Sequence, residues 1–367
     1  MFKQKCKLGI FIVLLVIIVT AAVGCGTAGE TSEAIKDDNG NQAREDISLT
    51  LASFWPENHF VEASGNLYFM KRVEELSEGK ITFEYHPGSV LGSAQDAIEM
   101  INSGVADIAA VCPTYLSGAM PLSNVSALPG AITTGEHGTL VLHRLVTDRD
   151  SIFFKNDFER NDIIPLVAAT NTPYEIVTTE KVGAIESADD FKGLKLRSGG
   201  GPQDASILAL GATPIQTVAA EQYEAIARGV VDGGVFPIPS LISNRTYEVL
   251  KYSSYGVGMS SFAITISISE NKWEQLPDWA QEILLKAGDE TAVYQGKFFD
   301  ETTDKDKIKL ESEYGIIFYE LPQAEMTKIF EPVWGTWAKS HEDLGFPAEE
   351  AIEKWNEMSN QVLEEIK

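Results

Sequence analysis

Residues 191–200 read FKGLKLRSGG and residues 210–237 read LGATPIQTVAAEQYEAIARGVVDGGVFP, and these two stretches decide the fold. The first is a turn that leads into a strand and a glycine loop, and Pro202 after it suits the first turn of a helix. The second contains a helix over 219–228 and a strand over 230–236. Strands that alternate with helices in this way predict an α/β fold with largely parallel sheets flanked by helices.

The same plan occurs earlier in the chain. Residues 98–108 (IEMINSGVADI) and 223–233 (YEAIARGVVDG) both run from a helix through Gly and Val to an Asp before a strand. We interpret the pair as one unit used in two lobes, although helix-glycine-strand turns are common in any α/β protein. A helical pattern from about 276 to 314 would form a helix about 50 Å long. That is longer than one lobe, so we expect this helix to bridge both.

Composition restricts the function. A chain of 367 residues is more than one core usually holds, which favours two lobes. Its 54 acidic and 29 basic residues give a formal charge of -25, which excludes binding to nucleic acid or an anionic membrane through the overall field. The five histidines are scattered, and neither a phosphate-binding Walker loop nor a G-x-S-x-G turn is present. We therefore expect no enzyme activity, no cofactor and no metal site.

The N-terminus predicts where the protein works. Residues 1–24 combine three lysines, an apolar run over 8–19 and small residues before Cys25, which is typical of a signal peptide. The small residues before Cys25 resemble a bacterial lipobox, and this resemblance implies a lipid on the Cys25 thiol. An uncleaved anchor helix is the alternative. Residues 25–46 are polar and predict a flexible tether. Cys112 lies in an apolar run and is expected to be buried and inert.

The chain as a whole resembles the solute-binding subunits of TRAP transporters, the DctP-type proteins. Besides the two opening stretches, HPGSVLGSAQDAIEMINSGVADIAAV (86–111) and LSNVSALPG (122–130) carry the resemblance, in order and at plausible spacing. It implies a two-lobed, periplasmic-binding-protein-like fold that captures a small organic anion in the cleft between the lobes. A long helix that spans both lobes is also a trait of the family.

From the strand pattern and this resemblance we predict the division of the chain. The predicted parts are the signal peptide 1–24, the tether 25–46, the first lobe 47–167 with 259–300, the second lobe 168–258 with 301–340, and a C-terminal docking helix within 341–367.

The resemblance also implies a central ligand-binding residue. The family's arginine in a G-x-K-x-R strand, which grips the ligand's carboxylate, corresponds to Arg197. Two family features are missing here. Phe236 stands where many members have a ligand-contacting Asn, and residues 171–174 supply no second arginine. Glu175 even has the opposite charge. Sialic acid and dicarboxylates are therefore disfavoured, and a monocarboxylate against an aromatic wall is favoured. A zwitterionic, amine-bearing or neutral polar ligand stays open.

Further ligand-contact candidates follow from strand ends, where ligands bind in α/β folds. Trp55 and His59 follow the first strand, Tyr115 follows the strand that contains Cys112, and Tyr174 precedes a strand. Trp55 suits a ligand contact and a loop staple equally well. Each of the two tyrosines suits a ligand contact or a packing role.

These observations predict a monomeric, lipid-anchored protein outside the cytoplasm that captures a small organic acid. Its expected partner is an ion-driven TRAP-type membrane permease, and its expected activity is closure of the lobes around ligand. The binding module of a sensor system would have the same fold with a receptor as partner. A secreted α/β enzyme is the third alternative, and the absence of a nucleophile-base pair near any glycine turn disfavours it.

Overall fold

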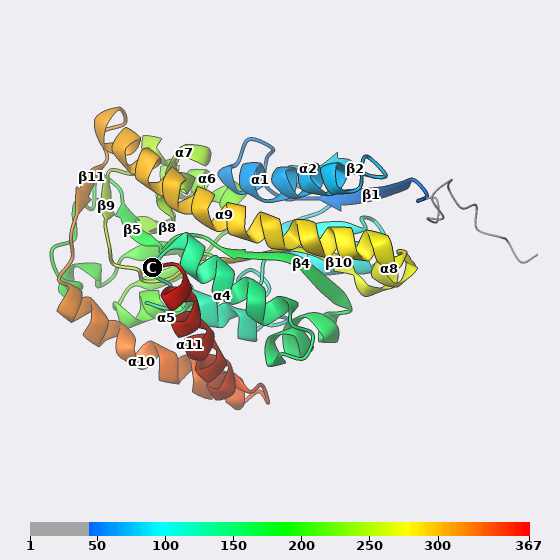
Figure 1. The fold of residues 1–367 in the computed structure, drawn as a ribbon. Helices are drawn as coiled ribbons and strands as arrows, with labels where there is room; N and C mark the ends of the chain where they lie inside the picture. The colour runs from blue at the N-terminus through cyan, green and yellow to red at the C-terminus, as the bar shows by residue number, and fades with distance from the viewer. Residues whose placement is uncertain (1–43) are drawn as a thin grey trace, which may run out of the picture. The chain divides into compact units, whose positions relative to one another are not determined.

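A computed structural model describes residues 44–367 of the chain. The predicted signal peptide, Cys25 and nearly all of the tether lie outside the described residues. Residues 45–367 contain two β-sheets flanked by helices (Figure 1). This architecture confirms the predicted two-lobed α/β fold. We call the part around the first sheet the first lobe and the part around the second sheet the second lobe.

The first sheet has the strand order β2-β1-β3-β10-β4. Its strands are β1 (Ile47–Ala52), β2 (Ile81–His86), β3 (Ile108–Val111), β4 (Ile163–Thr170) and β10 (Ala263–Ser269). Strand β1 pairs in parallel with β2 and β3, whereas β10 runs antiparallel to β3 and β4. Strands β4 and β10 are buried along their whole length, which explains their continuous apolar and small-residue sequence.

The second sheet has the order β11-β9-β5-β8-β6-β7. Its strands are β5 (Glu175–Thr178), β6 (Lys195–Ser198), β7 (Thr213–Gln216), β8 (Gly233–Phe236), β9 (Tyr252–Ser254) and β11 (Ile317–Tyr319). Strand β6 is parallel to β7 and β8, and β5 is antiparallel to β8 and β9. The antiparallel pairings in both sheets thus involve β5 or β10, which directly follow a passage of the chain from one lobe to the other.

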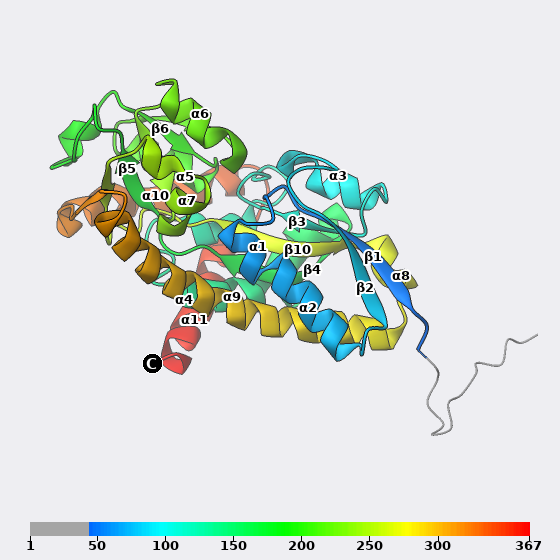
Figure 2. The ribbon, with the colours of Figure 1, turned by 90° about the horizontal axis from the view of Figure 1, so that it is seen from above.

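Two segments cross between the lobes, and we call residues 171–174 and 255–262 the crossing segments. They lie side by side, because the amide of Asn171 donates to the carbonyl of Phe262 at 3.1 Å and that of Tyr174 donates to Ser260 at 2.8 Å. Figure 2 shows the strands of the two sheets in separate regions, with α9 passing along both. The predicted lobe boundaries remain a prediction.

The helices cover both lobes. They are α1 (Phe60–Ser64), α2 (Asn66–Leu76), α3 (Ala97–Asn102), α4 (Gly135–Thr147), α5 (Pro202–Ala209), α6 (Gln222–Ala227), α7 (Ile238–Ser243), α8 (Glu270–Gln275), α9 (Asp278–Ser312), α10 (Gln323–Glu342) and α11 (Ala348–Glu365). Helices α1 and α2 are separated by a single residue, Gly65. A Cβ atom there would lie 2.8 Å from the carbonyl oxygen of Val61 and 2.7 Å from Nε2 of the Gln295 side chain in α9, so both crowd this position.

The predicted long helix is α9, which has 35 residues and contacts β4, α2 and α4 of the first lobe and α7 of the second. Its two glycines are points of close approach to neighbouring elements. A Cβ atom on Gly288 would lie 1.9 Å from the carbonyl oxygen of Leu166 in β4, and one on Gly296 would lie 2.8 Å from Cα of Glu136 in α4. Glycine therefore lets α9 lie directly against its neighbours.

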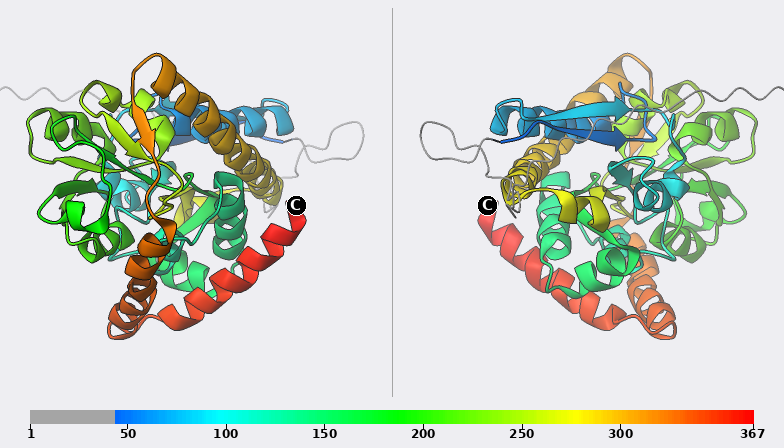
Figure 3. Two further views of the ribbon diagram at one scale, coloured as in Figure 1. Left: turned by 90° about the vertical axis from the view of Figure 1, so that its left-hand side faces the viewer. Right: turned by 90° about the vertical axis from the view of Figure 1, so that its right-hand side faces the viewer.

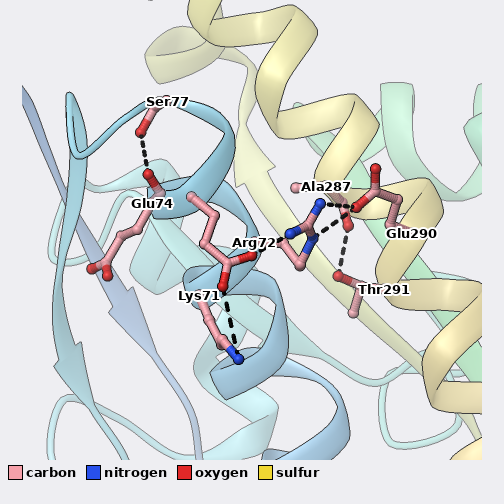
Figure 4. A network of polar contacts seen from close by, with 8 residues as sticks. Lys71, Arg72, Glu74, Ser77, Ala287, Glu290 and Thr291 are labelled. Carbon is pink, nitrogen blue, oxygen red and sulfur yellow. Dashed lines mark hydrogen bonds and ion pairs between the residues drawn. The ribbon is translucent and has the colours of Figure 1, made fainter.

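An ion pair also joins α9 to α2. The guanidinium of Arg72 donates through Nε to a carboxylate oxygen of Glu290 at 2.7 Å and contacts Glu75 of its own helix (Figure 4). Because the side chains of Arg72 and Glu290 are both partly solvated, this ion pair contributes only about 0–1 kcal/mol to the free energy of unfolding.

The C-terminal helix packs against the body. Helix α11 contacts α4 and α10 (Figure 3). On its apolar face, Trp355 and Val362 are fully buried, and the indole nitrogen of Trp355 donates to the carbonyl of Ala131 at 3.1 Å. Ile352 and Met358 are partly buried, whereas Ile366 is exposed at the chain end. The apolar face of α11 thus packs on the body.

Candidate functional site

A small cavity lies between the lobes, and all six predicted ligand-binding residues line it. These are Trp55, His59, Tyr115, Tyr174, Arg197 and Phe236. The remaining lining residues are Phe60, Asn171, Ala219, Gln222, Pro237, Ser240, Asn244 and Phe262. The cavity volume is only about 30 Å³, whereas ligand pockets usually measure about 300–1,000 Å³. A ligand can therefore enter only if the two lobes or their side chains move apart.

Arg197 is the charged group of this cavity. It stands in β6, its side chain is 3% exposed, and its Nε and Nη2 atoms donate to the carbonyl of Thr217 at 3.1 and 2.7 Å. Its Nη1 atom lies 3.5 Å from the carbonyl oxygen of Val235, and the ring of Phe236 lies 5.6 Å from its Cζ atom. Within residues 44–367, no carboxylate forms an ion pair with Arg197. A buried cation without a counter-charge is costly, and an anion would compensate it.

Tyr115 connects the two sides of the cavity. It follows β3 in the first lobe, and its hydroxyl accepts a hydrogen bond from the amide of Ala219 at 3.1 Å and from Nη2 of Arg197 at 3.4 Å, both in the second lobe. Its ring packs edge-on against Phe262 at 4.7 Å, and burial raises the pKa of its hydroxyl. A neutral hydroxyl thus occupies the donors that a carboxylate could use.

Aromatic rings form another wall of the cavity. Trp55 is 4% exposed, its ring lies 3.9 Å from that of Phe54, and it stacks on His59 at 5.8 Å. Trp55 therefore packs within its own loop and also lines the cavity, and its contact with a ligand remains a prediction. His59 caps α1, because its Nδ1 atom accepts a hydrogen bond from the amide of Val61 at 3.3 Å. Burial lowers the pKa of His59 to about 3, so the ring is neutral.

The glycine loop 199–201, which follows β6, does not line the cavity. The amide of Gly199 donates to the side chain of Gln203 at 2.7 Å, and that of Gly200 donates to Ser198. Gly199 is needed for packing, since a Cβ atom there would lie 3.2 Å from the ring of Phe262.

Glu175 was expected to place negative charge near the ligand, but it does not line the cavity. Its carboxylate accepts hydrogen bonds from the Ser254 hydroxyl at 2.6 Å and from the amides of Gly256 and Val257 at 2.7 and 3.4 Å. Glu175 thereby ties the start of β5 to the other crossing segment. Burial, partly offset by these hydrogen bonds, raises its pKa to about 7.

Sequence reasoning missed several lining residues, above all Asn171 and Gln222, which are 4% and 2% exposed. Asn171 directly follows β4, so the strand-end rule that selected Trp55 and Tyr115 could have selected it as well. Gln222 opens α6 and carries no comparable signal, because a glutamine at a helix start is common on protein surfaces.

The comparisons with known proteins agree with this architecture. The family model described as bacterial extracellular solute-binding protein, family 7 (DctP), matches residues 51–342. The chain belongs to this family. A DctP-type protein is the solute-binding subunit of a TRAP transporter, so it works outside the cytoplasm and is not an enzyme. Among residues 44–367, no helix combines the length and the apolar character that a membrane crossing requires.

Three relatives illustrate the range of the DctP family. The C4-dicarboxylate-binding protein DctB of Bacillus subtilis is 25% identical over 82% of this chain and 85% of its own. A Bordetella bronchiseptica TRAP solute-binding protein with bound mandelate is 22% identical, with a TM-score of 0.77 over 86% of this chain and 99% of that one. A marine metagenome protein specific for aromatic acids, in complex with 3-hydroxybenzoate, is 24% identical, with a TM-score of 0.80 over 87% and 99%. These two structures share the fold of this chain.

Proposed function

We propose that this DctP-type protein captures a small organic monocarboxylate in the cavity between its lobes, with Arg197 as the ionic anchor. The observation that carries this proposal is the buried guanidinium of Arg197, which has no acidic partner within residues 44–367 and faces an aromatic wall. A guanidinium can hold a carboxylate through two parallel hydrogen bonds. The cavity lining contains no second arginine and no lysine, which favours one carboxylate over two.

The composition of the wall supports a ligand with an apolar or aromatic body. Trp55, Tyr115, Tyr174, Phe236 and His59 would contact that body, and aromatic side chains provide large contact areas at low entropic cost. The relatives with bound mandelate and 3-hydroxybenzoate show that this fold can hold aromatic acids. The dicarboxylate named for the Bacillus relative would need a second cation that this cavity lacks.

Ligand binding would close the lobes. The two crossing segments and α9 connect the lobes, and the cavity of about 30 Å³ is too small to admit an organic acid from solution. An open form must therefore exist, in which the Tyr115 contacts to Arg197 and Ala219 are broken. A ligand that contacts both lobes would then favour the closed form.

Delivery would take place at the membrane. The lipid on Cys25 and the tether 25–46 would keep the monomeric protein near the outer face of the membrane, where it would release its ligand to the TRAP-type permease. These points rest on the sequence of the N-terminus and on the family, since Cys25 lies outside the described residues.

Calorimetric titration tests the proposal through matched acids and amides. Mandelate and 3-hydroxybenzoate are compared with mandelamide and 3-hydroxybenzamide, which keep the shape and lose the charge. The acid should bind at least about 30-fold more tightly than its amide, because only the acid neutralises Arg197. Equal binding of acid and amide would contradict an ionic anchor.

A further inference from the structure

Three buried polar atoms of the cavity lining have no hydrogen-bond partner within the described part of the chain. They are Nε2 of His59, Oδ1 of Asn171 and Nε2 of Gln222, and the three side chains are 3%, 4% and 2% exposed. Leaving a buried polar group unpaired is costly, so such groups are uncommon in proteins. Three of them on one cavity indicate positions that a ligand fills.

The neighbours of these atoms determine what each can offer. Nδ1 of His59 accepts from the amide of Val61 at 3.3 Å, so the neutral ring carries its proton on Nε2 and donates there. Nδ2 of Asn171 donates to the hydroxyl of Tyr174 at 3.2 Å, which leaves Oδ1 as a free acceptor. Nε2 of Gln222 is an amide donor. The cavity thus offers two unused donors and one unused acceptor besides Arg197.

The three side chains come from separate parts of the fold. His59 precedes α1 in the first lobe, Asn171 begins a crossing segment, and Gln222 opens α6 in the second lobe. A ligand group that satisfies them would contact both lobes and the passage between them. Such a group would therefore strengthen the closed form selectively.

We propose that the ligand carries a hydroxyl group besides its carboxylate, and that this hydroxyl donates to Asn171 Oδ1 and accepts from His59 Nε2 or Gln222 Nε2. The inference rests on the proposed function, because it assumes that Arg197 holds a carboxylate in the same cavity. A hydroxyl both donates and accepts, so it matches a mixed set of partners. A second carboxylate would repel the Asn171 oxygen, and an ammonium group would meet two donors. The ligand class is thus a hydroxylated monocarboxylic acid with an apolar body.

Pairs of acids that differ by one hydroxyl test this inference. Phenylacetate is compared with mandelate, whose hydroxyl lies next to the carboxylate, and benzoate with 3-hydroxybenzoate, whose hydroxyl lies across the ring. In at least one pair, calorimetry should show the hydroxylated acid binding at least about tenfold more tightly, because the unhydroxylated acid leaves the buried atoms unpaired. The preferred pair identifies the position of the hydroxyl.

Two variants and a control assign the effect to residues. Asn171→Leu and Gln222→Met remove the hydrogen-bonding groups at similar volume. Each should reduce the affinity for the hydroxylated acid and leave the affinity for the unhydroxylated acid of the same pair nearly unchanged, so the ratio of the two affinities should fall. Gln275→Met, an exposed glutamine of α8, should leave the preference as in the wild type. Unfolding temperatures of all variants are measured first, and Gln222→Met keeps the test valid if Asn171→Leu fails to fold.

The outcomes separate this inference from the proposed function. Equal binding within both pairs would overturn the hydroxyl inference and leave the carboxylate proposal intact. A preference that survives in both Asn171→Leu and Gln222→Met would overturn the assignment to these residues. If no acid of the panel binds, or if Arg197→Ala binds them all as the wild type does, both proposals fail.

Discussion

Arg197 is a buried cation that contacts only uncharged groups among the residues described, and the account of ligand binding depends on it. Arg197→Lys keeps the charge but loses the planar fork, and Arg197→Ala loses both. We expect affinity for the monocarboxylate to fall in the order wild type, Lys, Ala. The loss for Ala should be about 2–5 kcal/mol, or roughly 30-fold or more. Calorimetric titration measures both variants.

Arg72→Ala is the matched control for this series. Arg72 lies in α2 and pairs with Glu290 away from the cavity (Figure 4), so its loss should leave ligand affinity unchanged. Because Arg197 also donates to the carbonyls of Thr217 and Val235, melting temperatures are compared alongside. If Arg197→Ala folds and binds the ligand with wild-type affinity, Arg197 is not the anchor, and the aromatic wall must recognise the ligand instead.

At the residue scale, the sequence predicted the aromatic and charged part of the cavity but not the amide part. Trp55, Tyr115 and Tyr174 were found because aromatic residues at strand ends are conspicuous. Gln222 was missed because its place in the cavity lining depends on which side of α6 faces the other lobe. Likewise the sequence alone did not show that the side chain of Gln203 accepts a hydrogen bond from the amide of Gly199.

Among the elements, the start of β5 combines a structural tie with a titratable group. Burial raises the pKa of Glu175 from 4.5 to about 7. A carboxyl group with a raised pKa binds its proton more tightly in the folded state, so its contribution to stability falls as pH rises from 4.5 to 7. The free energy of unfolding of the wild type, relative to Glu175→Gln, should therefore decrease by about 3 kcal/mol over that range.

Urea unfolding of both proteins at several pH values measures this difference. The other buried carboxyl groups, such as Asp157, are present in both proteins and cancel. A difference that stays constant between pH 4.5 and 7, or that rises, would show that burial does not raise the pKa of Glu175.

Helix α9 depends on a glycine where it touches β4. Gly288→Ala would place a Cβ atom 1.9 Å from the carbonyl oxygen of Leu166, so α9 or β4 would have to shift. We expect a loss of at least about 1–3 kcal/mol in the free energy of unfolding, as for other overpacked sites. Chemical denaturation measures the loss.

Gly335→Ala in α10 is the matched control, because no atom lies within 4 Å of its added Cβ. There the alanine should stabilise the protein by about 0.4–1 kcal/mol through its better helix propensity. Equal effects of the two substitutions would contradict the close approach of α9 to β4.

Most helices and strands could be predicted from local sequence patterns. The exceptions depend on contacts between residues that are distant in the sequence. Alternating strands and helices, and the length of α9, are local patterns that a single sequence displays. The break between α1 and α2 falls at Gly65, where an added Cβ atom would meet both Gln295 of α9 and the carbonyl oxygen of Val61. The antiparallel placement of β10 likewise depends on the return of the chain from the second lobe.

For the whole molecule, the first prediction concerns the anchor. Cys25→Ala should abolish incorporation of radiolabelled palmitate, because the thiol of Cys25 is the expected site of lipid attachment. Cys6→Ala is the control, since Cys6 lies in the predicted signal peptide and should not affect labelling. Full labelling of Cys25→Ala would contradict the lipoprotein proposal.

The second prediction concerns movement, and it follows from the size of the cavity. If an organic acid enters a cavity of about 30 Å³, the lobes must separate first and close afterwards. Val90 in the first lobe and Val230 in the second are 71% and 50% exposed, so cysteines there can carry spin labels. Cys112 is fully buried, and burial raises the pKa of its thiol well above the usual range, so it should not compete for label.

The most direct test of the central claim is the distance between these two labels, measured by double electron–electron resonance with and without a monocarboxylate of measured affinity. We predict a broad or two-peaked distribution without ligand that collapses to a single peak when ligand saturates the protein. Arg197→Ala should keep the ligand-free distribution at the same ligand concentration. A distribution that is unchanged in the wild type while calorimetry shows the ligand bound would contradict capture by lobe closure around Arg197.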